Sequence, residues 1–324
     1  MPAARIRAVA AHLPERVLGN AELCGIAPGW TPEKILEKTG VSERRIAAPG
    51  QTAGDLAEAA ARALFAREGV DPAAIDHLIF CSQSPDHPLP ATACILHARL
   101  GLPAHAGAFD MAVGCSGFVY GLGLAKGLIE SGQARCVLLL TADTYSRLLR
   151  DDDLSVRSLF GDGAAATLIE AANDNDPRRI GRLAYGTDGA GARQLMVEAG
   201  GARRPVSETA GDDRLFMDGP AVMAFALREP PAAVARLLSE ADAAIGDFDL
   251  VVPHQASLIV LQGLRRRLGA AAERFVIDLA ETGNTVSASI PLALSRLPTS
   301  DHPRRLLLLG FGVGLSWAAA DIVF

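Results

Sequence analysis

Short apolar runs alternate along the chain with longer stretches in which apolar residues recur three and four positions apart. Runs of about four to eight apolar residues predict buried strands, and the longer periodic stretches predict helices that bury one face. In the first half the runs predict strands over residues 6–9, 77–81, 106–113, 136–142 and 159–168, the last with a Gly-Asp-Gly turn. The periodic stretches predict helices over residues 32–38 (capped by Thr31), 52–68, 90–100 and 118–131.

The same alternation returns in the second half, after the polar, turn-rich segment 171–179. It predicts helices over residues 220–243 (interrupted near Pro230 and Pro231), 257–268 and 289–297, and strands over residues 250–252, 275–277, 306–309 and 316–323. Strands that alternate with helices indicate an α/β protein. Because both halves offer a similar order of elements, we expect a duplicated α/β unit with its site between the halves.

The composition agrees with this picture and excludes several classes of protein. The length of 324 residues suits two domains of ordinary size, and 49% hydrophobic with 21% charged residues is a globular composition. Only 5% of residues are aromatic, so the core must consist mainly of Ala, Val, Leu and Ile. A net charge of -6 provides no global basic field for nucleic acid. No apolar stretch reaches the roughly 18 residues of a membrane span, so we expect no membrane partner.

The cysteines suggest free thiols. There are five of them, an odd number without CxxC spacing, which predicts neither a zinc site nor a disulfide framework: Cys24, Cys81, Cys94, Cys115 and Cys136. Free thiols fit a reducing cytoplasm, which is the expected location.

Cys115 lies between a predicted strand and a predicted helix, a position that would place its sulfur at a helix N-terminus. The helix dipole and the unpaired N–H groups there stabilise a thiolate, which is the attacking form of cysteine. Gly114 and Gly117 permit the tight turn that this geometry needs. Position alone, however, favours a buried structural cysteine. That is our interpretation of Cys81, Cys94 and Cys136.

Three further positions carry candidate chemistry. His254 follows a predicted strand, and strand ends in α/β folds face the ligand crevice, where an imidazole can donate to an oxyanion or move a proton. Asn284, in Thr-Gly-Asn-Thr, is by itself an ordinary turn asparagine. The glycine-rich segment 310–314 could provide a backbone N–H for an oxyanion hole, but it lacks the lysine of a P-loop.

Together, in order and spacing, these positions match one family. The chain resembles the 3-oxoacyl-acyl carrier protein synthase III branch of the thiolase superfamily. Six stretches carry the resemblance: residues 38–45 (KTGVSERR), 113–120 (VGCSGFVY), 159–165 (LFGDGAA), 252–256 (VPHQA), 283–291 (GNTVSASIP) and 310–317 (GFGVGLSW). The resemblance implies a thiolase-like fold of two duplicated α/β halves in a five-layered α-β-α-β-α arrangement. Residues 1–172 would carry Cys115, and residues 173–324 would carry His254 and Asn284.

The resemblance also implies a reaction. Cys115 would accept an acyl group, and His254 and Asn284 would hold the thioester oxygen of a malonyl group while it loses CO2. The backbone N–H groups of Cys115 and Val313 would form the hole for the tetrahedral intermediate. The implied activity is a decarboxylating Claisen condensation of an acyl group with a malonyl thioester, giving a 3-oxoacyl thioester. No metal or other cofactor is expected.

Substrates and partners follow from the same resemblance. Phe311 and Gly312 would line the substrate pocket beside the nucleophile. Family members are dimers, and Leu89 stands where one subunit caps the acyl pocket of its partner, so we expect a homodimer. The malonyl group is expected on acyl carrier protein, which is acidic. Three arginines match part of a basic docking patch, although they also suit an ordinary helix end: Arg265, Arg266 and Arg267.

The match departs from the family at the site that holds the adenine of CoA. Lys34 stands at the position of its tryptophan and Leu154 at the position of its arginine, and Trp30 or Arg157 would have to substitute. Loss of this stacking and charge pairing weakens CoA binding. The sequence therefore predicts a specialised synthase, loaded from an acyl carrier protein or an unusual CoA ester.

Three alternatives remain beside this hypothesis. The first is a housekeeping enzyme that starts fatty-acid synthesis from acetyl-CoA. The second is an acyltransferase of the same fold that forms an ester or an amide. The third is a catalytically silent partner of a heterodimeric synthase, against which the presence of Cys115 argues. Asn284 favours condensation over simple acyl transfer, because only condensation needs an enolate stabiliser.

Overall fold

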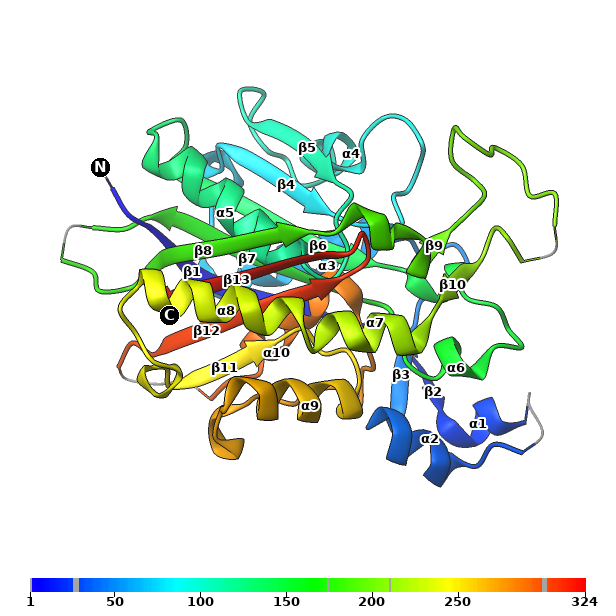
Figure 1. Ribbon diagram of the computed structural model, residues 1–324. Helices are drawn as coiled ribbons and strands as arrows, with labels where there is room; N and C mark the ends of the chain where they lie inside the picture. Colours follow the sequence, from blue (N-terminus) through cyan, green and yellow to red (C-terminus); the bar gives the residue numbers. More distant parts are fainter. Residues whose placement is uncertain (1, 26–28, 174, 210, 299–301) are drawn as a thin grey trace.

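Two mixed β-sheets, one from each half of the chain, form the centre of the computed structural model (Figure 1). The structure describes residues 2–25, 29–173, 175–209, 211–298 and 302–324. The first sheet contains, in spatial order, β1 (Ala4–His12), β7 (Gly163–Ala171), β6 (Cys136–Asp143), β4 (His77–Cys81) and β5 (Gly107–Met111). The second contains β11 (Leu250–Pro253), β12 (Arg305–Gly312), β13 (Ser316–Val323) and β8 (Arg179–Thr187).

The two sheets repeat one pairing scheme. In the first sheet β1–β7 and β7–β6 are antiparallel, whereas β6–β4 and β4–β5 are parallel. In the second sheet β8–β13 and β13–β12 are antiparallel, and β12–β11 is parallel. A single parallel bridge between Val251 and Phe275 stands in the place of a fifth strand. The chain is therefore a duplicated α/β unit.

The prediction of a strand over residues 275–277 is wrong, because among these described residues only Phe275 forms a bridge to the sheet. The buried side chain of Gln255 donates to the carbonyl of Val276 at 3.3 Å and accepts the N–H of Asp278 at 2.7 Å. These are backbone groups that a longer ladder would have used, so the side chain replaces the strand.

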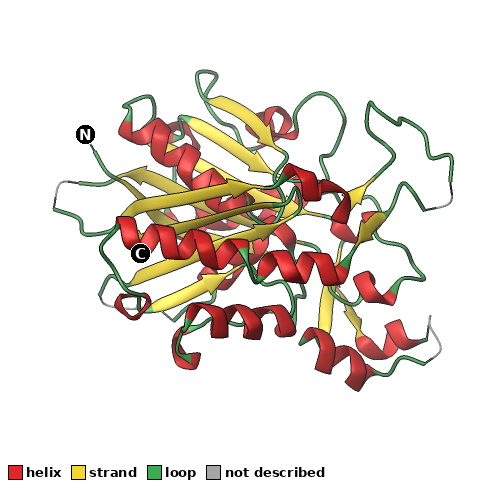
Figure 2. Cartoon of the chain, viewed as in Figure 1, coloured by secondary structure: helices red, strands yellow, loops and turns green. Residues whose placement is uncertain are grey.

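Helices and sheets alternate in five layers, and Figure 2 distinguishes the helices from the strands by colour. The outer face of the first sheet is covered by α3 (Ala53–Glu68) and α4 (Thr92–Arg99). Between the sheets lie α5 (Gly117–Glu130) and α10 (Ser289–Ser295). The outer face of the second sheet is covered by α7 (Gly219–Ala226), α8 (Glu229–Glu240) and α9 (Leu258–Leu268). The expected α-β-α-β-α arrangement is confirmed.

The core reflects the low aromatic content. Successive residues of a strand point to opposite faces, so Leu139 of β6 packs toward the middle layer, while Leu138 and Leu140 pack under α3 and α4. On its inner face α3 presents Ala57 and Ala60, both without solvent exposure. Small side chains let the helix approach the sheet closely, and each buried leucine contributes about 1.5–3 kcal/mol to folding.

Most predicted elements are present within a few residues of their predicted bounds. The predicted interruption of the helix near Pro230 and Pro231 is also confirmed. Both prolines lie in the first turn of α8, where the backbone N–H groups have no partner within the helix and proline is tolerated. Shorter elements were not predicted: β2 (Arg16–Gly19), α1 (Asn20–Cys24), β3 (Glu43–Ile46), α6 (Leu154–Arg157), β9 (Leu195–Val197) and β10 (Leu215–Met217). The edge strand β8 was also missed. In the described part of the chain no helix is both long and apolar enough to cross a membrane.

Candidate active site

Cys115 lies in a tight turn between β5 and α5. The turn closes with a hydrogen bond from the N–H of Gly117 to the carbonyl of Gly114 at 2.7 Å. A side chain at Gly117 would collide with the sulfur of Cys81, and one at Gly114 would lie 2.5 Å from the amide oxygen of Gln83. Close packing therefore disfavours a side chain at both positions, and the turn delivers the Cys115 side chain to the N-terminal end of α5, between the two sheets.

The β12–β13 hairpin of the other half packs directly against this turn. A Cβ added at Gly312 would lie 2.9 Å from both Cβ and Sγ of Cys115, and one at Gly310 would lie 2.7 Å from Cα of Ser116. Glycine thus permits the hairpin backbone to reach the nucleophile. The backbone N–H groups of Cys115 and Val313 both face the sulfur and lower the pKa of its thiol. The structure therefore brings together the two N–H groups that the resemblance assigns to the oxyanion hole.

The surroundings of Cys115 nevertheless favour the neutral thiol over the thiolate. Its burial, and secondarily the nearby carboxyl of Asp143, raise the pKa of Cys115, while the two backbone N–H groups lower it by less. The N–H groups at this turn favour the thiolate, as expected from the sequence, but burial raises the pKa of Cys115 by more. Removal from water disfavours the charged form more than the local hydrogen bonds favour it.

His254 is held as a neutral imidazole. Its backbone N–H donates to the carbonyl of Leu309 at 2.8 Å, and its ring packs edge-on against Phe311 with centroids 5.4 Å apart. Burial lowers the pKa of His254 to about 3. Nδ1 lies 2.7 Å from the hydroxyl oxygen of Ser289, which also accepts the N–H of Gln255 at 3.4 Å. The hydroxyl of Ser289 therefore holds the imidazole through Nδ1 and leaves Nε2 as its other polar atom.

Asn284 is fixed through both its backbone and its side chain. Its N–H donates to the carbonyl of Leu159 at 2.8 Å, and its carbonyl accepts the N–H of Gly161 at 3.0 Å. Its side-chain oxygen accepts the N–H of Val286 at 2.8 Å. The NH2 group is therefore the remaining donor of this side chain.

These residues meet through a short chain of contacts. His254 touches Phe311, Phe311 precedes the Gly312 that packs on Cys115, and Val286 shares an apolar cluster with Cys115. The structure thus brings Cys115, His254 and Asn284 to one place, from three segments far apart in the sequence. Phe311, 3% exposed, and Gly312 lie at this centre, as the resemblance implied.

An apolar wall around Cys115 was not predicted. It comes mainly from short elements whose sequences carry no distinctive pattern: Tyr145, Leu149, Val156, Phe160, Leu195, Leu215 and Val286. The ring of Tyr145 packs against Phe160 with centroids 4.8 Å apart, and its hydroxyl donates to the side-chain oxygen of Gln83 at 3.3 Å. The wall surrounds Cys115 with apolar side chains and places one polar pair, Tyr145 and Gln83, nearby.

Other candidate residues lie away from this centre. Leu89 is 86% exposed, in the loop between β4 and α4. Arg265 is half-buried and donates to the carbonyl of Ala270 at the end of α9, as a helix-end arginine does. Arg266 and Arg267 are exposed, and within the described residues neither forms an ion pair.

The residues considered as substitutes at the CoA site are already engaged. Trp30 packs in a cluster with Leu154, and Nζ of Lys38 lies 5.0 Å from the centre of its ring. Arg157 pairs with Asp151. The five cysteines are free thiols, but Cys94 is exposed, so its interpretation as a buried structural residue is wrong.

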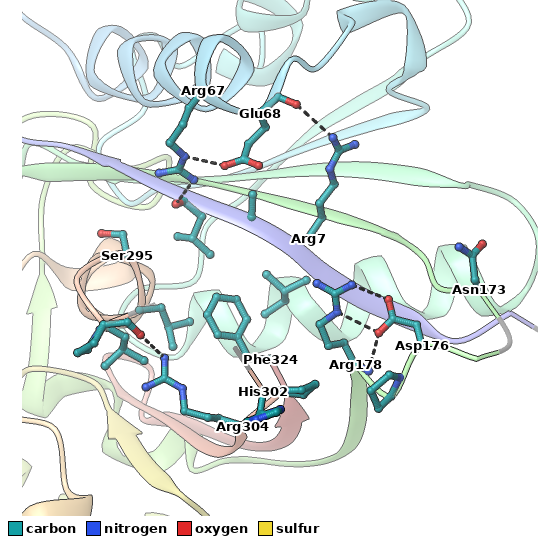
Figure 3. A pocket seen from close by; sticks show the side chains of 18 of the residues that line it. Arg7, Arg67, Glu68, Asn173, Asp176, Arg178, Ser295, His302, Arg304 and Phe324 are labelled. Carbon is teal, nitrogen blue, oxygen red and sulfur yellow. Dashed lines mark hydrogen bonds and ion pairs between the residues drawn. The ribbon is translucent and has the colours of Figure 1, made fainter. Parts of the chain in front are cut away.

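A groove of about 940 Å³ lies apart from the candidate site (Figure 3). It is lined by β1, the end of α10 and neighbouring segments, and none of Cys115, His254 and Asn284 lines it. Its arginines are engaged within the protein: Arg7 with Glu170, Arg67 with Glu68, Arg178 with Asp176, and Arg304 with the carbonyl of Pro298. Among the described residues no three His, Cys, Asp or Glu side chains gather in a metal-binding group.

Comparison with known proteins gives matches across the chain. The family model described as 3-Oxoacyl-[acyl-carrier-protein (ACP)] synthase III matches residues 109–189. Its C-terminal counterpart matches residues 238–324. Beta-ketoacyl-[acyl-carrier-protein] synthase III of Roseiflexus sp. (strain RS-1) is 39% identical over 316 residues, which cover 96% of this chain and 95% of the relative.

Solved structures agree. A crystal structure of a 3-oxoacyl-(acyl-carrier-protein) synthase III has a TM-score of 0.96 and 49% identity, and the match covers 100% of both chains. The priming beta-ketosynthase from the R1128 polyketide biosynthetic pathway has a TM-score of 0.91 and 32% identity, covering 100% of this chain and 96% of the other. The thiolase-like fold expected from the sequence is confirmed.

Proposed function

The chain belongs to the 3-oxoacyl-acyl carrier protein synthase III family, and we propose the residues through which it acts as a condensing acyltransferase. It condenses an acyl group with a malonyl thioester, and in this proposal Cys115 carries the acyl group. The observation that best supports the assignment is that His254 contacts Phe311 and Asn284 holds Val286, two residues on segments that pack around the buried Cys115.

The first step loads the enzyme. The sulfur of Cys115 attacks the carbonyl carbon of the donor thioester, the thiol proton passes to the departing thiol, and an acyl-Cys115 thioester forms. The N–H groups of Cys115 and Val313 stabilise the oxyanion of the tetrahedral intermediate. Because burial favours the neutral thiol, its proton must leave during the attack, and in this proposal it passes to the sulfur of the departing thiol.

The second step forms the carbon–carbon bond. The bond between the malonyl α-carbon and its carboxylate breaks, CO2 leaves, and the electron pair becomes an enolate. Nε2–H of His254 and the NH2 group of Asn284 donate to the enolate oxygen. The enolate carbon attacks the acyl carbonyl, and Cys115 departs as a thiolate that takes up a proton. These steps are redox-neutral, and the proposal includes no metal or cofactor.

The acyl donor in this proposal is an acyl carrier protein or an uncommon CoA ester. Leu154 lies in an apolar cluster with Trp30, and Lys38 already covers the Trp30 ring. This corner therefore offers no free aromatic–arginine clamp for an adenine. The malonyl group arrives on acyl carrier protein, and the unpaired Arg266 and Arg267 at the end of α9 attract that acidic partner.

The proposal also includes a homodimer working in the cytoplasm, where the five thiols stay reduced. β5 is an edge strand of the first sheet, and beside it an apolar groove of about 420 Å³ includes Phe109 and Leu124, 37% and 45% exposed. A second copy would cover this edge, which otherwise presents unpaired backbone groups. In such a dimer the exposed Leu89 can reach the acyl pocket of the partner.

Intact-protein mass spectrometry tests the function. The protein is incubated with a panel of acyl-CoA and acyl-carrier-protein donors, with Cys115→Ala as control, and then with malonyl-acyl carrier protein. An adduct that requires Cys115 and then yields a 3-oxoacyl product with CO2 supports condensation and identifies the donor. An adduct that discharges only to an alcohol or an amine would instead establish an ester- or amide-forming acyltransferase.

A further inference from the structure

A buried carboxyl that the proposed chemistry does not use lies close to the site. Asp143 ends β6 and has no solvent exposure. Its two oxygens are hydrogen-bonded to different halves of the chain. One accepts the N–H of Gln83 at 2.7 Å and the hydroxyl of Ser82 at 3.4 Å. The other accepts the hydroxyl of Ser287 at 2.7 Å and the Ser287 N–H at 3.4 Å.

Ser287 belongs to the turn that follows Asn284. Between them Val286 has a φ of 52°, a left-handed conformation that costs a β-branched residue about 1–2 kcal/mol. Such a conformation persists only when its surroundings hold it. In this conformation the N–H of Val286 points back to the side-chain oxygen of Asn284, at 2.8 Å.

The turn is therefore held from both ends. The bridge to Leu159 and Gly161 fixes the backbone of Asn284, and the carboxyl of Asp143 fixes Ser287. Val286 lies between the two anchors. Without the anchor at Ser287, Val286 can relax to a negative φ, which would turn its N–H away from the Asn284 side chain.

We propose that Asp143 is a positioning residue for decarboxylation. Through Ser287 it holds the turn that aims the side-chain NH2 of Asn284 at the enolate oxygen. This role rests on the proposed function of Asn284, and Asp143 itself touches no reacting atom in it. Because Asp143 lies in the first half of the chain and Asn284 in the second, the link also fixes the two halves of the site relative to each other.

If Asp143 has this role, its substitution should slow decarboxylation of the malonyl group without slowing acylation of Cys115. Cys115 is acylated without help from Asn284, so acylation should survive loss of the link. Burial raises the pKa of Asp143 to about 7, and its charge contributes to the raised pKa of Cys115. Asparagine at position 143 removes that charge and should not slow acylation.

The test compares Asp143→Asn and Ser287→Ala with Ser82→Ala, which contacts the same carboxyl from the first half alone. Acylation of Cys115 is followed by mass spectrometry, and CO2 release from malonyl-acyl carrier protein is followed with a labelled carboxyl group. We expect a roughly 10–100-fold lower kcat for CO2 release in the first two variants, with KM and acylation within about 2-fold of wild type. Ser82→Ala should behave like wild type.

A double-mutant cycle identifies the route. In an Asn284→Ala background, Asp143→Asn should cause no further loss, because the amide it positions is absent. Any one of three results would overturn the proposal. Asp143→Asn and Ser287→Ala could both release CO2 at the wild-type rate, or Ser82→Ala could lose as much activity as they do. Alternatively, Asp143→Asn could cause the same loss in the Asn284→Ala background as in the wild-type background. If Asp143→Asn does not fold, Ser287→Ala carries the test.

Failure of the proposed function gives a different result. A wild-type protein that loads an acyl group but releases no CO2 would reject condensation itself. The crystal structure of Ser287→Ala then decides the inference alone. The hydrogen bond from Val286 N–H to the Asn284 side chain should be lost, and its retention would contradict the positioning role.

Discussion

The hydroxyl oxygen of Ser289 lies 2.7 Å from Nδ1 of His254, and both groups are buried between the two halves of the chain. Ser289 is the first residue of α10, whereas His254 follows β11. The contact orients the ring of a histidine whose other nitrogen, Nε2, donates a hydrogen bond to the enolate oxygen in the proposed condensation. The proposed enolate site therefore depends on Ser289 as well as on Asn284.

Substituting Ser289 tests this contact. Ser289→Ala removes the hydrogen bond to Nδ1, so the ring can rotate. We expect CO2 release to fall about 10-fold, in line with the loss of one buried hydrogen bond. Ser295→Ala, on the same helix but at its other end, is the control. Equal rates of CO2 release for the two variants would show that Ser289 does not orient the ring.

The pH dependence of stability should reveal the buried His254. The folded pKa of about 3 lies below the ordinary 6.5, so the unfolded chain binds a proton that the native protein excludes. Stability from this group is present above pH 6.5 and is lost as the pH falls, by at most about 1.4 kcal/mol per unit. Urea unfolding of wild type and His254→Gln from pH 4 to 8 isolates the effect. If the difference in the free energy of unfolding between the two proteins stays constant below pH 6.5, the imidazole of His254 is not buried in its neutral form.

The raised pKa of Cys115 predicts slow alkylation at neutral pH. Iodoacetamide reacts with the thiolate, so the rate at Cys115 should climb with pH through 9 without a plateau. The exposed Cys94 provides a competing thiol in the same molecule, and peptide mass mapping separates the two. A plateau below pH 8 at Cys115 would mean that the helix N-terminus outweighs burial after all.

The proposed dimer edge can be tested with two apolar residues of similar size and similar exposure. Leu124→Asp places a charge in the apolar groove beside β5, and Ile277→Asp places one on an unrelated surface; the wild-type residues are 45% and 43% exposed. Sedimentation should show a dimer for wild type and Ile277→Asp and a monomer for Leu124→Asp. A dimeric Leu124→Asp protein would place the interface elsewhere.

Carrier-protein docking should depend on the end of α9. Reversing the charge in Arg266→Glu and Arg267→Glu should raise KM for malonyl-acyl carrier protein about 10-fold and weaken its salt dependence, with little change in kcat. Arg135→Glu is the control, because this exposed arginine precedes β6 at the end of the strand opposite Asp143. If Arg266→Glu and Arg267→Glu have the same KM as Arg135→Glu, then α9 is not part of the docking surface.

The sequence predicted the fold well where the pattern was strong. Long periodic helices such as α3, and uninterrupted apolar runs such as β4, fall where their residues place them. The edge strand β8 was missed because glycines and arginines interrupt its alternation. The strand at residues 275–277 failed for the opposite reason, since an apolar run was present but the Gln255 side chain took its backbone partners.

By itself, the sequence determined the layered α/β architecture, the duplication, and the three residues proposed for catalysis, because these depend on local periodicity and on ordered motifs. Only the tertiary structure decided the state of those residues. Burial between two sheets raises the pKa of Cys115 and lowers that of His254, and no local pattern reports how much water remains at a site. Asp143 likewise carries no motif of its own. Its place in the site comes from a hydrogen bond to Ser287, 144 residues away, which exists only once the two halves have packed together.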